Sequence, residues 1–224
     1  MTRPTPPGGP SARWRSLVDR AFITPLLPPP RLRRLVQLCV GLYLFGLGLA
    51  AQVVTGLGVA PWDVLHQGLH LRTGWSIGTW AVVTGAAVIV LWIPLRQRAG
   101  LGTLLNVVGV GTAMDVSLLW LPVPQTLAGQ VALLAAGIVA VAAGSGLYIG
   151  AGLGPGPRDG LMTGLADRGM SILAARTLIE VAVVAAGFAL GGTVGVGTLL
   201  FAVAIGPLTQ VFLPILRADR RAGG

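Results

Sequence analysis

Apolar residues along this chain gather into six long runs, separated by short stretches rich in glycine, proline or arginine. The runs occupy residues 35–57, 76–95, 101–121, 127–150, 171–191 and 193–216. Most of them approach or exceed the ~20 residues that an α-helix needs to cross the hydrocarbon core of a bilayer. The pattern therefore predicts an all-α membrane protein with six transmembrane helices.

Two shorter segments, 61–72 and 157–168, follow the first and fourth runs, and each begins with a proline. Proline suits the first position of a helix, because that position has no intrahelical partner for its N–H group. Segments of this length are too short to cross a bilayer. They are expected to form short helices that either lie at the membrane interface or re-enter the membrane.

The composition supports one membrane domain with a polar tail at each end. The chain is 54% hydrophobic and 10% charged, whereas about a quarter of the residues in a soluble domain are charged. Residues 35–216 are therefore expected to form a single transmembrane domain. Residues 1–34, rich in proline and arginine, are expected to be a disordered cytoplasmic tail, with a short interfacial helix around residues 14–23 as an alternative. Residues 217–224 are the second cytoplasmic tail.

The arginines indicate how the spans are oriented. With the N-terminus in the cytoplasm, 14 of the 16 arginines fall in the N-terminal tail, the 96–100 loop, the 151–170 loop and the C-terminal tail. The loops on the opposite side carry Arg72, and Arg176 lies inside a span. Because positive residues concentrate on the cytoplasmic side, both termini are expected to be cytoplasmic. The net charge of +9 is thus explained by topology, and no nucleic-acid partner is expected.

The two halves of the chain share a pattern. The segment from Gly56 to Asp63 recurs as Gly152 to Asp159, 96 residues later, and the segment 102–105 recurs as 197–200, 95 residues later. Repeat 1 would span about 35–121 and repeat 2 about 127–216. Since each repeat holds three spans, the second must enter the membrane in the opposite orientation. Inverted repeats of this kind are typical of secondary transporters.

Asp63 and Asp159 are the first candidates for a substrate or ion site. Each follows a glycine-rich turn and falls in the first turn of a predicted short helix, where the helix dipole favours a carboxylate. Discontinuous helices at matching positions of two halves often mark a binding site. The alternative is that both aspartates only cap helices at the interface.

Four further polar residues lie inside predicted spans. Asn106 and Asp115 belong to the third span, and Arg176 and Glu180 to the fifth. Ionisable groups in a membrane are costly and commonly face a bundle interior or water. Glu180 is the stronger candidate for a proton or ion carrier, although Arg176 could instead pair with it four residues along the helix in a structural unit. Solvated capping is the alternative for Asp115.

No enzymatic signature is present in the sequence. There is no nucleophile elbow, no phosphate loop and no metal-ligand spacing, so no catalytic residues, cofactor or metal are expected. His66 and His70 stand four residues apart without a neighbouring cysteine or metalloprotease pattern. They are interpreted as packing or interfacial histidines.

Three motifs resemble the YczE/YyaS/YitT-type family of bacterial membrane proteins, and its YczE-like branch fits best. They are residues 56–69, the glycine-tryptophan-serine segment 74–78, and 102–106 with the trailing 111–115. The resemblance covers about 35–215 and implies a multi-pass protein of the bacterial inner membrane. The second half departs from the first, because Phe201 replaces Asn106 and Gln210 replaces Asp115. Those two polar residues would therefore act once per molecule.

These observations together predict a small secondary transporter or permease with its site between the two halves. Its expected partners are the lipid bilayer and an unknown small molecule or ion, with Glu180 or an aspartate coupled to protons. A homodimer is a further expectation by analogy, because six spans are few for a transporter. The alternative function is a non-transporting membrane scaffold or regulatory partner of another complex.

Overall fold

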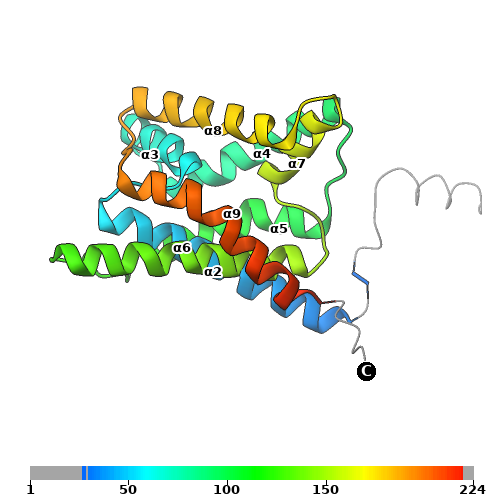
Figure 1. Ribbon diagram of the computed structural model, residues 1–224, viewed down its shortest axis with the longest axis horizontal. Coiled ribbons are helices and arrows are strands. Elements are labelled where there is room, and N and C mark those ends of the chain that lie inside the picture. The colour runs from blue at the N-terminus through cyan, green and yellow to red at the C-terminus, as the bar shows by residue number, and fades with distance from the viewer. Residues whose placement is uncertain (1–26, 29, 219–224) are drawn as a thin grey trace, which may run out of the picture.

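The computed structural model describes residues 27–28 and 30–218, and the regular structure within these ranges is entirely helical. In chain order the helices are α2 (Arg31–Thr55), α3 (Pro61–Thr73), α4 (Ile77–Leu95), α5 (Leu101–Leu118), α6 (Leu127–Gly150), α7 (Pro157–Ala166), α8 (Ile172–Ala189) and α9 (Val196–Leu216). Figure 1 shows their arrangement. The disordered tail and interfacial helix expected before residue 27, and the tail after residue 218, lie outside the described residues.

Six helices in the described part are long and apolar enough to cross a membrane: α2, α4, α5, α6, α8 and α9. This confirms the predicted all-α membrane protein with six candidate spans. The short helices α3 and α7 occur where they were expected. One boundary differs, because α2 begins at Arg31 and residues 31–34 are helical instead of belonging to the tail. The Arg34 guanidinium donates to the carbonyl of Ala151 (2.6 Å), which accommodates this arginine in the first turn.

Helices α2 and α6 pack together most closely, through glycines that face each other at two levels. A Cβ atom added at Gly48 would lie 2.5 Å from the carbonyl oxygen of Gly137, and one at Gly144 would lie 2.6 Å from that of Gly41. At these distances a side chain of any size would collide with the facing backbone, so only glycine fits at these positions. Small residues allow such close backbone approach in membranes, where packing drives helix association. The apolar core extends from this contact.

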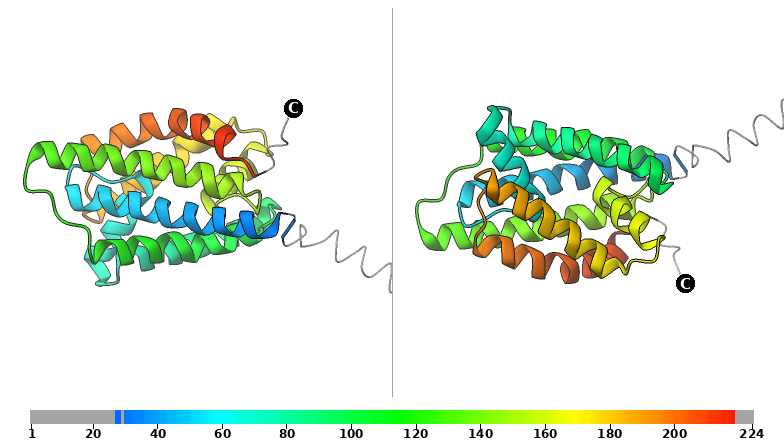
Figure 2. Two further views of the ribbon diagram at one scale, coloured as in Figure 1. Left: turned by 90° about the horizontal axis from the view of Figure 1, so that it is seen from below. Right: turned by 90° about the horizontal axis from the view of Figure 1, so that it is seen from above.

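Helices α2 and α6 lie together at one face of the bundle, and most of the other helices lie to one side of this pair (Figure 1 and Figure 2). Helix α5 packs on α2, and α9 packs on α6. Each short helix makes its main contact with a long helix from the other half of the chain: α3 packs on α8, and α7 packs on α4. The indole N–H of Trp92 on α4 donates to the carbonyl of Pro157 (3.0 Å), which ties the start of α7 to α4.

The breaks that follow α2 and α6 have the same backbone conformation. Gly56 and Gly152 both have φ of 67°, while Gly58 and Gly154 have φ of 112° and 118°. Residues with a side chain rarely adopt such positive φ angles, whereas glycine adopts them at little cost. The glycines of the repeated motif are thus explained by the turn that each must make.

Each break is also closed by the first turn of another helix. The carbonyl of Leu57 accepts a hydrogen bond from the N–H of Gly197 on α9 (2.8 Å), and the carbonyl of Leu153 accepts one from Gly102 on α5 (2.7 Å). These backbone groups would otherwise lack partners where the helices are interrupted.

Most of the arginine-bearing loops meet at one end of the bundle. Arg34 reaches Ala151, as described above, and the N–H of Ala218 donates to Gly150 (2.9 Å). At the same end of the bundle, Gln97, just after α4, donates to Asp167, just after α7 (2.8 Å). The start of α2 and the end of α9 therefore lie together, as Figure 1 shows.

We expect Gly144→Leu to destabilise the fold, because its side chain would collide with the backbone of α2. Overpacking of this kind costs about 1–3 kcal/mol or more, measured as a lower thermal midpoint in detergent. Ala136→Leu, at an exposed position of the same helix, is the matched control and should change the midpoint little. Equal effects of the two variants would contradict the close α2–α6 contact.

Candidate functional site

A cavity of about 320 Å³ lies at the centre of the bundle, and all eight described helices contribute to its lining. Four charged side chains line it: Arg158, Asp159, Arg176 and Glu180. Aromatic side chains line it as well: Phe45, Trp62, Tyr148 and Phe201. A charged cluster enclosed by transmembrane helices is a feature of substrate and ion pathways.

The short helices α3 and α7 both begin at this cavity, since Pro61 and Pro157 line it. Their other ends lie at opposite ends of α4. Beyond the C-terminus of α3, Trp75 accepts a hydrogen bond from His70 (2.6 Å) just before α4 starts. Beyond that of α7, Arg168 donates to the carbonyl of Pro94, near the end of α4. The two helices thus diverge from the middle of the molecule.

Arg158 and Trp62 meet where the two short helices begin. The guanidinium carbon of Arg158 lies 4.8 Å from the centre of the Trp62 ring. These residues occupy corresponding positions of the repeated motif, 96 residues apart. A cation over an aromatic face is stabilised by the ring quadrupole.

Asp159 is held by two donors. Its Oδ2 accepts hydrogen bonds from the hydroxyl of Tyr148 (2.7 Å) and from the backbone N–H of Gly156 (3.2 Å). The second bond caps the start of α7, so the capping alternative describes part of its role. Asp159 also lines the cavity.

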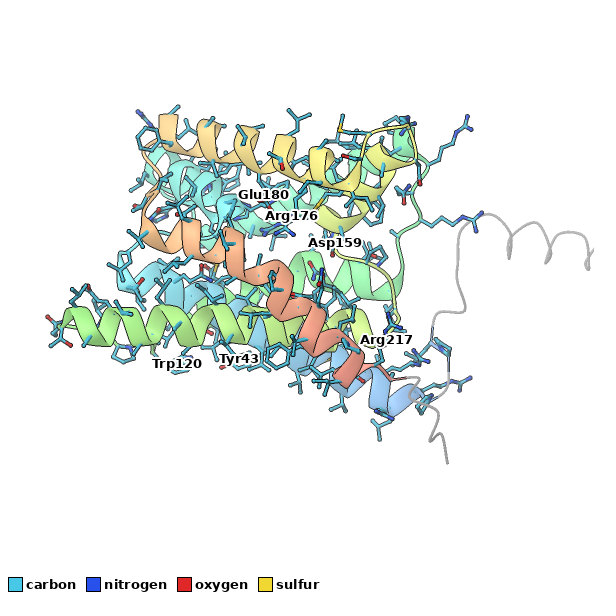
Figure 3. All side chains as sticks on the ribbon, viewed as in Figure 1. Tyr43, Trp120, Asp159, Arg176, Glu180 and Arg217 are labelled. Carbon is cyan, nitrogen blue, oxygen red and sulfur yellow. The ribbon has the colours of Figure 1, made fainter. Side chains whose placement is uncertain are left out.

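Arg176 and Glu180 form an ion pair on α8, with 2.9 Å between Nε and Oε1. The predicted pairing four residues apart is therefore present. Their side chains are 33% and 23% exposed, respectively, because they face the cavity. Figure 3 shows both residues with Asp159 in the middle of the molecule.

Asp63 lies behind the cavity lining and is 1% exposed. Its Oδ1 is hydrogen-bonded to Nδ1 of His66 (2.8 Å), and Nε2 of His66 is hydrogen-bonded to the hydroxyl of Thr84 (2.7 Å). Thr84 lines the cavity, so this chain of polar groups leads from the cavity to Asp63.

Asp63 and Asp159 differ in their partners, although their sequence motifs match. Among the described residues, Oδ2 of Asp63 and Oε1 of Gln52 are buried without a hydrogen-bond partner. Gln52 occupies the position that corresponds to Tyr148, 96 residues earlier. The tyrosine hydroxyl reaches Asp159 directly, whereas the shorter glutamine makes no such bond to Asp63.

The cavity lies in an asymmetric part of the bundle. Helix α4 packs along α5, but α8 and α9, which follow α7 in the same order, have almost no contact with each other. In Figure 1, α9 runs obliquely away from α8. The cavity lies in the angle between them, with Glu180 on one side and Thr209 and Gln210 on the other.

Asn106 lines this cavity, whereas Asp115 does not. Oδ2 of Asp115 accepts from the hydroxyl of Ser76 (2.5 Å), and Oδ1 accepts from the N–H of Gly78 (2.9 Å). Asp115 thus binds the first turn of α4 and corresponds to the capping alternative. Within the described residues no group of three or more histidine, cysteine or acidic side chains is placed to hold a metal ion.

A family of unknown function, DUF6198, matches residues 32–214 of the chain. The match includes both glycine-rich breaks, both short helices and nearly all of the six candidate spans. The chain belongs to this family. No solved structure matches it.

Relatives of this DUF6198 protein confirm the resemblance seen in the motifs. An uncharacterized protein of Haemophilus influenzae is 40% identical over 180 residues, which cover 80% of this chain and 83% of the relative. The uncharacterized membrane protein YczE of Bacillus subtilis is 34% identical over 178 residues, covering 78% and 82%. The uncharacterized protein YyaS of the same organism is 28% identical over 185 residues, covering 79% and 90%.

Sequence reasoning missed three residues of the DUF6198 cavity and its surroundings. The charge pattern counts Arg158 only among the loop arginines, no sequence pattern above singles out Trp62, and His66 is interpreted only as a packing or interfacial histidine. The repeat itself could have identified Arg158 and Trp62. They occupy corresponding positions directly before the repeated aspartates, yet one is a cation and the other an aromatic residue. For His66, the signal was its spacing of three residues from Asp63, which places both on one helix face.

We expect Asp115→Ala to lower stability without affecting the cavity, since it removes the carboxylate that accepts from Ser76 and Gly78 at the start of α4. Loss of an N-terminal cap costs about 1 kcal/mol, with a range of about 0.5–2 kcal/mol. The thermal midpoint in detergent measures this loss. Unchanged stability combined with altered ligand binding would instead place Asp115 in the functional site.

Proposed function

We propose that this DUF6198 protein is a small secondary transporter of the bacterial inner membrane, with its substrate site in the central cavity. The observation that carries the proposal is the meeting of α3 and α7 at a cavity lined by charged residues. Interrupted helices whose N-termini face a central site are a recurring construction of secondary transporters. The proposal assigns the protein no enzymatic activity.

We further infer that residues of about 35–121 and 127–216 form two repeats of inverted topology. The matching φ angles of the two breaks support this inference, as do the two equivalent hydrogen bonds, from Gly197 to Leu57 and from Gly102 to Leu153. The contact between Arg158 and Trp62 also supports it. Corresponding residues can touch each other only where they lie near the axis that relates the two repeats.

Helices α3 and α7 are assigned as re-entrant helices in this proposal. Each begins at the central cavity and ends at a loop, and the two loops lie at opposite ends of α4. The end that holds the arginine-rich loops is assigned to the cytoplasm, because positive residues favour that side. Both termini are then cytoplasmic, and the loop between α3 and α4 faces the periplasm.

Asp63 is the proposed proton carrier. It is buried, one of its oxygens has no partner among the described residues, and His66 and Thr84 connect it to the cavity. A carboxylate that gains and loses a proton inside a membrane can couple a pH gradient to substrate movement. Glu180 is less suited to this role, because Arg176 already neutralises it.

Solute-driven proton movement tests the transporter. Purified protein in liposomes loaded with a pH-sensitive dye is exposed to amino acids, organic acids, sugars and nucleobases. We expect at least one solute to move protons, and Asp63→Asn to abolish this movement because its side chain cannot titrate. Asp115→Asn is the control and should retain it. A folded protein that responds to no solute and co-purifies with a second membrane protein would favour the scaffold function.

Cysteine labelling tests the inverted topology. In a Cys39→Ala background, Gly74→Cys and Gly169→Cys place thiols at matched glycines after α3 and α7, where an added Cβ meets open space. Because both glycines have positive φ, of 78° and 96°, thermal unfolding first establishes that each variant is folded. We expect a membrane-impermeant maleimide to label Gly74→Cys in spheroplasts and Gly169→Cys only in inverted vesicles. Labelling of both from one side would contradict inverted repeats.

A further inference from the structure

The guanidinium of Arg158 is the group in the cavity whose hydrogen-bonding capacity is least used. Arginine carries five N–H donors and is always charged. Among the described residues Arg158 makes neither a hydrogen bond nor an ion pair, and its close contact is with the face of Trp62. A contact with the ring face engages the charge but none of the donors. Those donors remain available to an acceptor within the cavity.

The carboxylates that line the cavity are already engaged. Asp159 accepts hydrogen bonds from Tyr148 and Gly156, and Glu180 is paired with Arg176 at 2.9 Å. Asp63, Asp159 and Glu180 attract Arg158 electrostatically, but none of them forms an ion pair with it, and Asp63 is bonded to His66 at 2.8 Å. The cavity lining therefore presents one cation that lacks a directly bonded anion.

The starts of α3 and α7 add to this positive potential. The N-terminus of a helix carries a partial positive charge and free N–H groups. Helix α3 has 13 residues and α7 has 10, and the first residue of each lines the cavity. Asp63 and Asp159 stand in these first turns and offset part of the two dipoles, so the Arg158 guanidinium is the main attraction for an anion in the cavity.

The rest of the lining is suited to an apolar body of limited size. Trp62 lies against Arg158, and Val88, Phe201 and Ile205 provide apolar surface elsewhere in the lining. A volume of about 320 Å³ is at the small end of the range for small-molecule sites, about 300–1,000 Å³. Such a cavity accommodates a compact ligand better than a long chain.

We propose that the cavity binds a small organic acid whose oxyanion, a carboxylate or phosphate, is held by the Arg158 guanidinium. The apolar part of the ligand would pack against Trp62 and Phe201. Arginine binds both oxyanions through two parallel hydrogen bonds. This assignment rests on the transporter proposed above and names its substrate class.

Binding to the purified full-length protein in detergent tests the assignment, with lactate, benzoate and phenyl phosphate as probes. Benzylamine and glucose serve as cationic and neutral comparisons at constant ionic strength. We expect at least one oxyanion to bind. Arg158→Gln should lower its affinity by about tenfold to hundredfold, the effect of losing hydrogen bonds to a charged group. The preferred probe distinguishes a carboxylate from a phosphate ligand.

Two further variants make the result interpretable. Arg158→Lys keeps the charge but loses the planar fork, so its affinity should lie between that of the wild type and that of Arg158→Gln. Arg33→Gln removes one positive charge at an exposed position and should bind like the wild type. Thermal unfolding without ligand shows whether each variant is folded. If Arg158→Gln is not folded, the affinity of Arg158→Lys is compared with that of the wild type instead.

Three results would overturn the anion site: equal affinity in a folded Arg158 variant, binding of benzylamine alone, or no binding of any oxyanion. Failure of the transporter looks different. Oxyanion binding through Arg158 without solute flux in liposomes would refute transport but would still support the oxyanion site at Arg158. Flux of a sugar or amine that is insensitive to Arg158→Gln would refute the site and leave transport standing.

Discussion

Two backbone hydrogen bonds hold the interruptions on which the centre of this protein depends. Leu57 and Leu153 lie in the breaks after α2 and α6, and their carbonyls accept from Gly197 and Gly102. An unpaired backbone group in hydrocarbon costs several kcal/mol, so a chain can interrupt a helix there only when another segment supplies the partner. Because α9 and α5 do so, α3 and α7 can begin inside the bundle.

The cavity follows from this arrangement. Helices α3 and α7 each pack on a long helix from the other part of the chain, α8 and α4, so the cavity forms only when both parts are assembled. Arg158 then rests on Trp62 in the middle, and the separation of α8 from α9 leaves space beside it. The close glycine contact between α2 and α6 holds this frame on the opposite side.

The sequence predicted the spans well because bilayer thickness imposes their length, and it located the breaks because only glycine adopts their positive φ angles. It could not predict which polar residues face the cavity, since that depends on helix rotation and tilt. Asp115 was expected in the site but caps α4, while Arg158 was counted as a loop residue. The matched motifs also hid the difference between Asp63 and Asp159, which arises because Tyr148 stands where the first half has Gln52.

Water access to the cavity is the measurement that tests the central claim most directly. In a Cys39→Ala background, Thr209→Cys places a thiol on the α9 wall of the cavity. A small, charged thiol reagent added to either side of the membrane reports whether this position can be reached. A solute site between moving halves predicts reaction from both sides and protection by the substrate, while wild-type Cys39, exposed on the surface of α2, should stay unreactive in lipid. A thiol at position 209 that reacts from neither side would contradict the account.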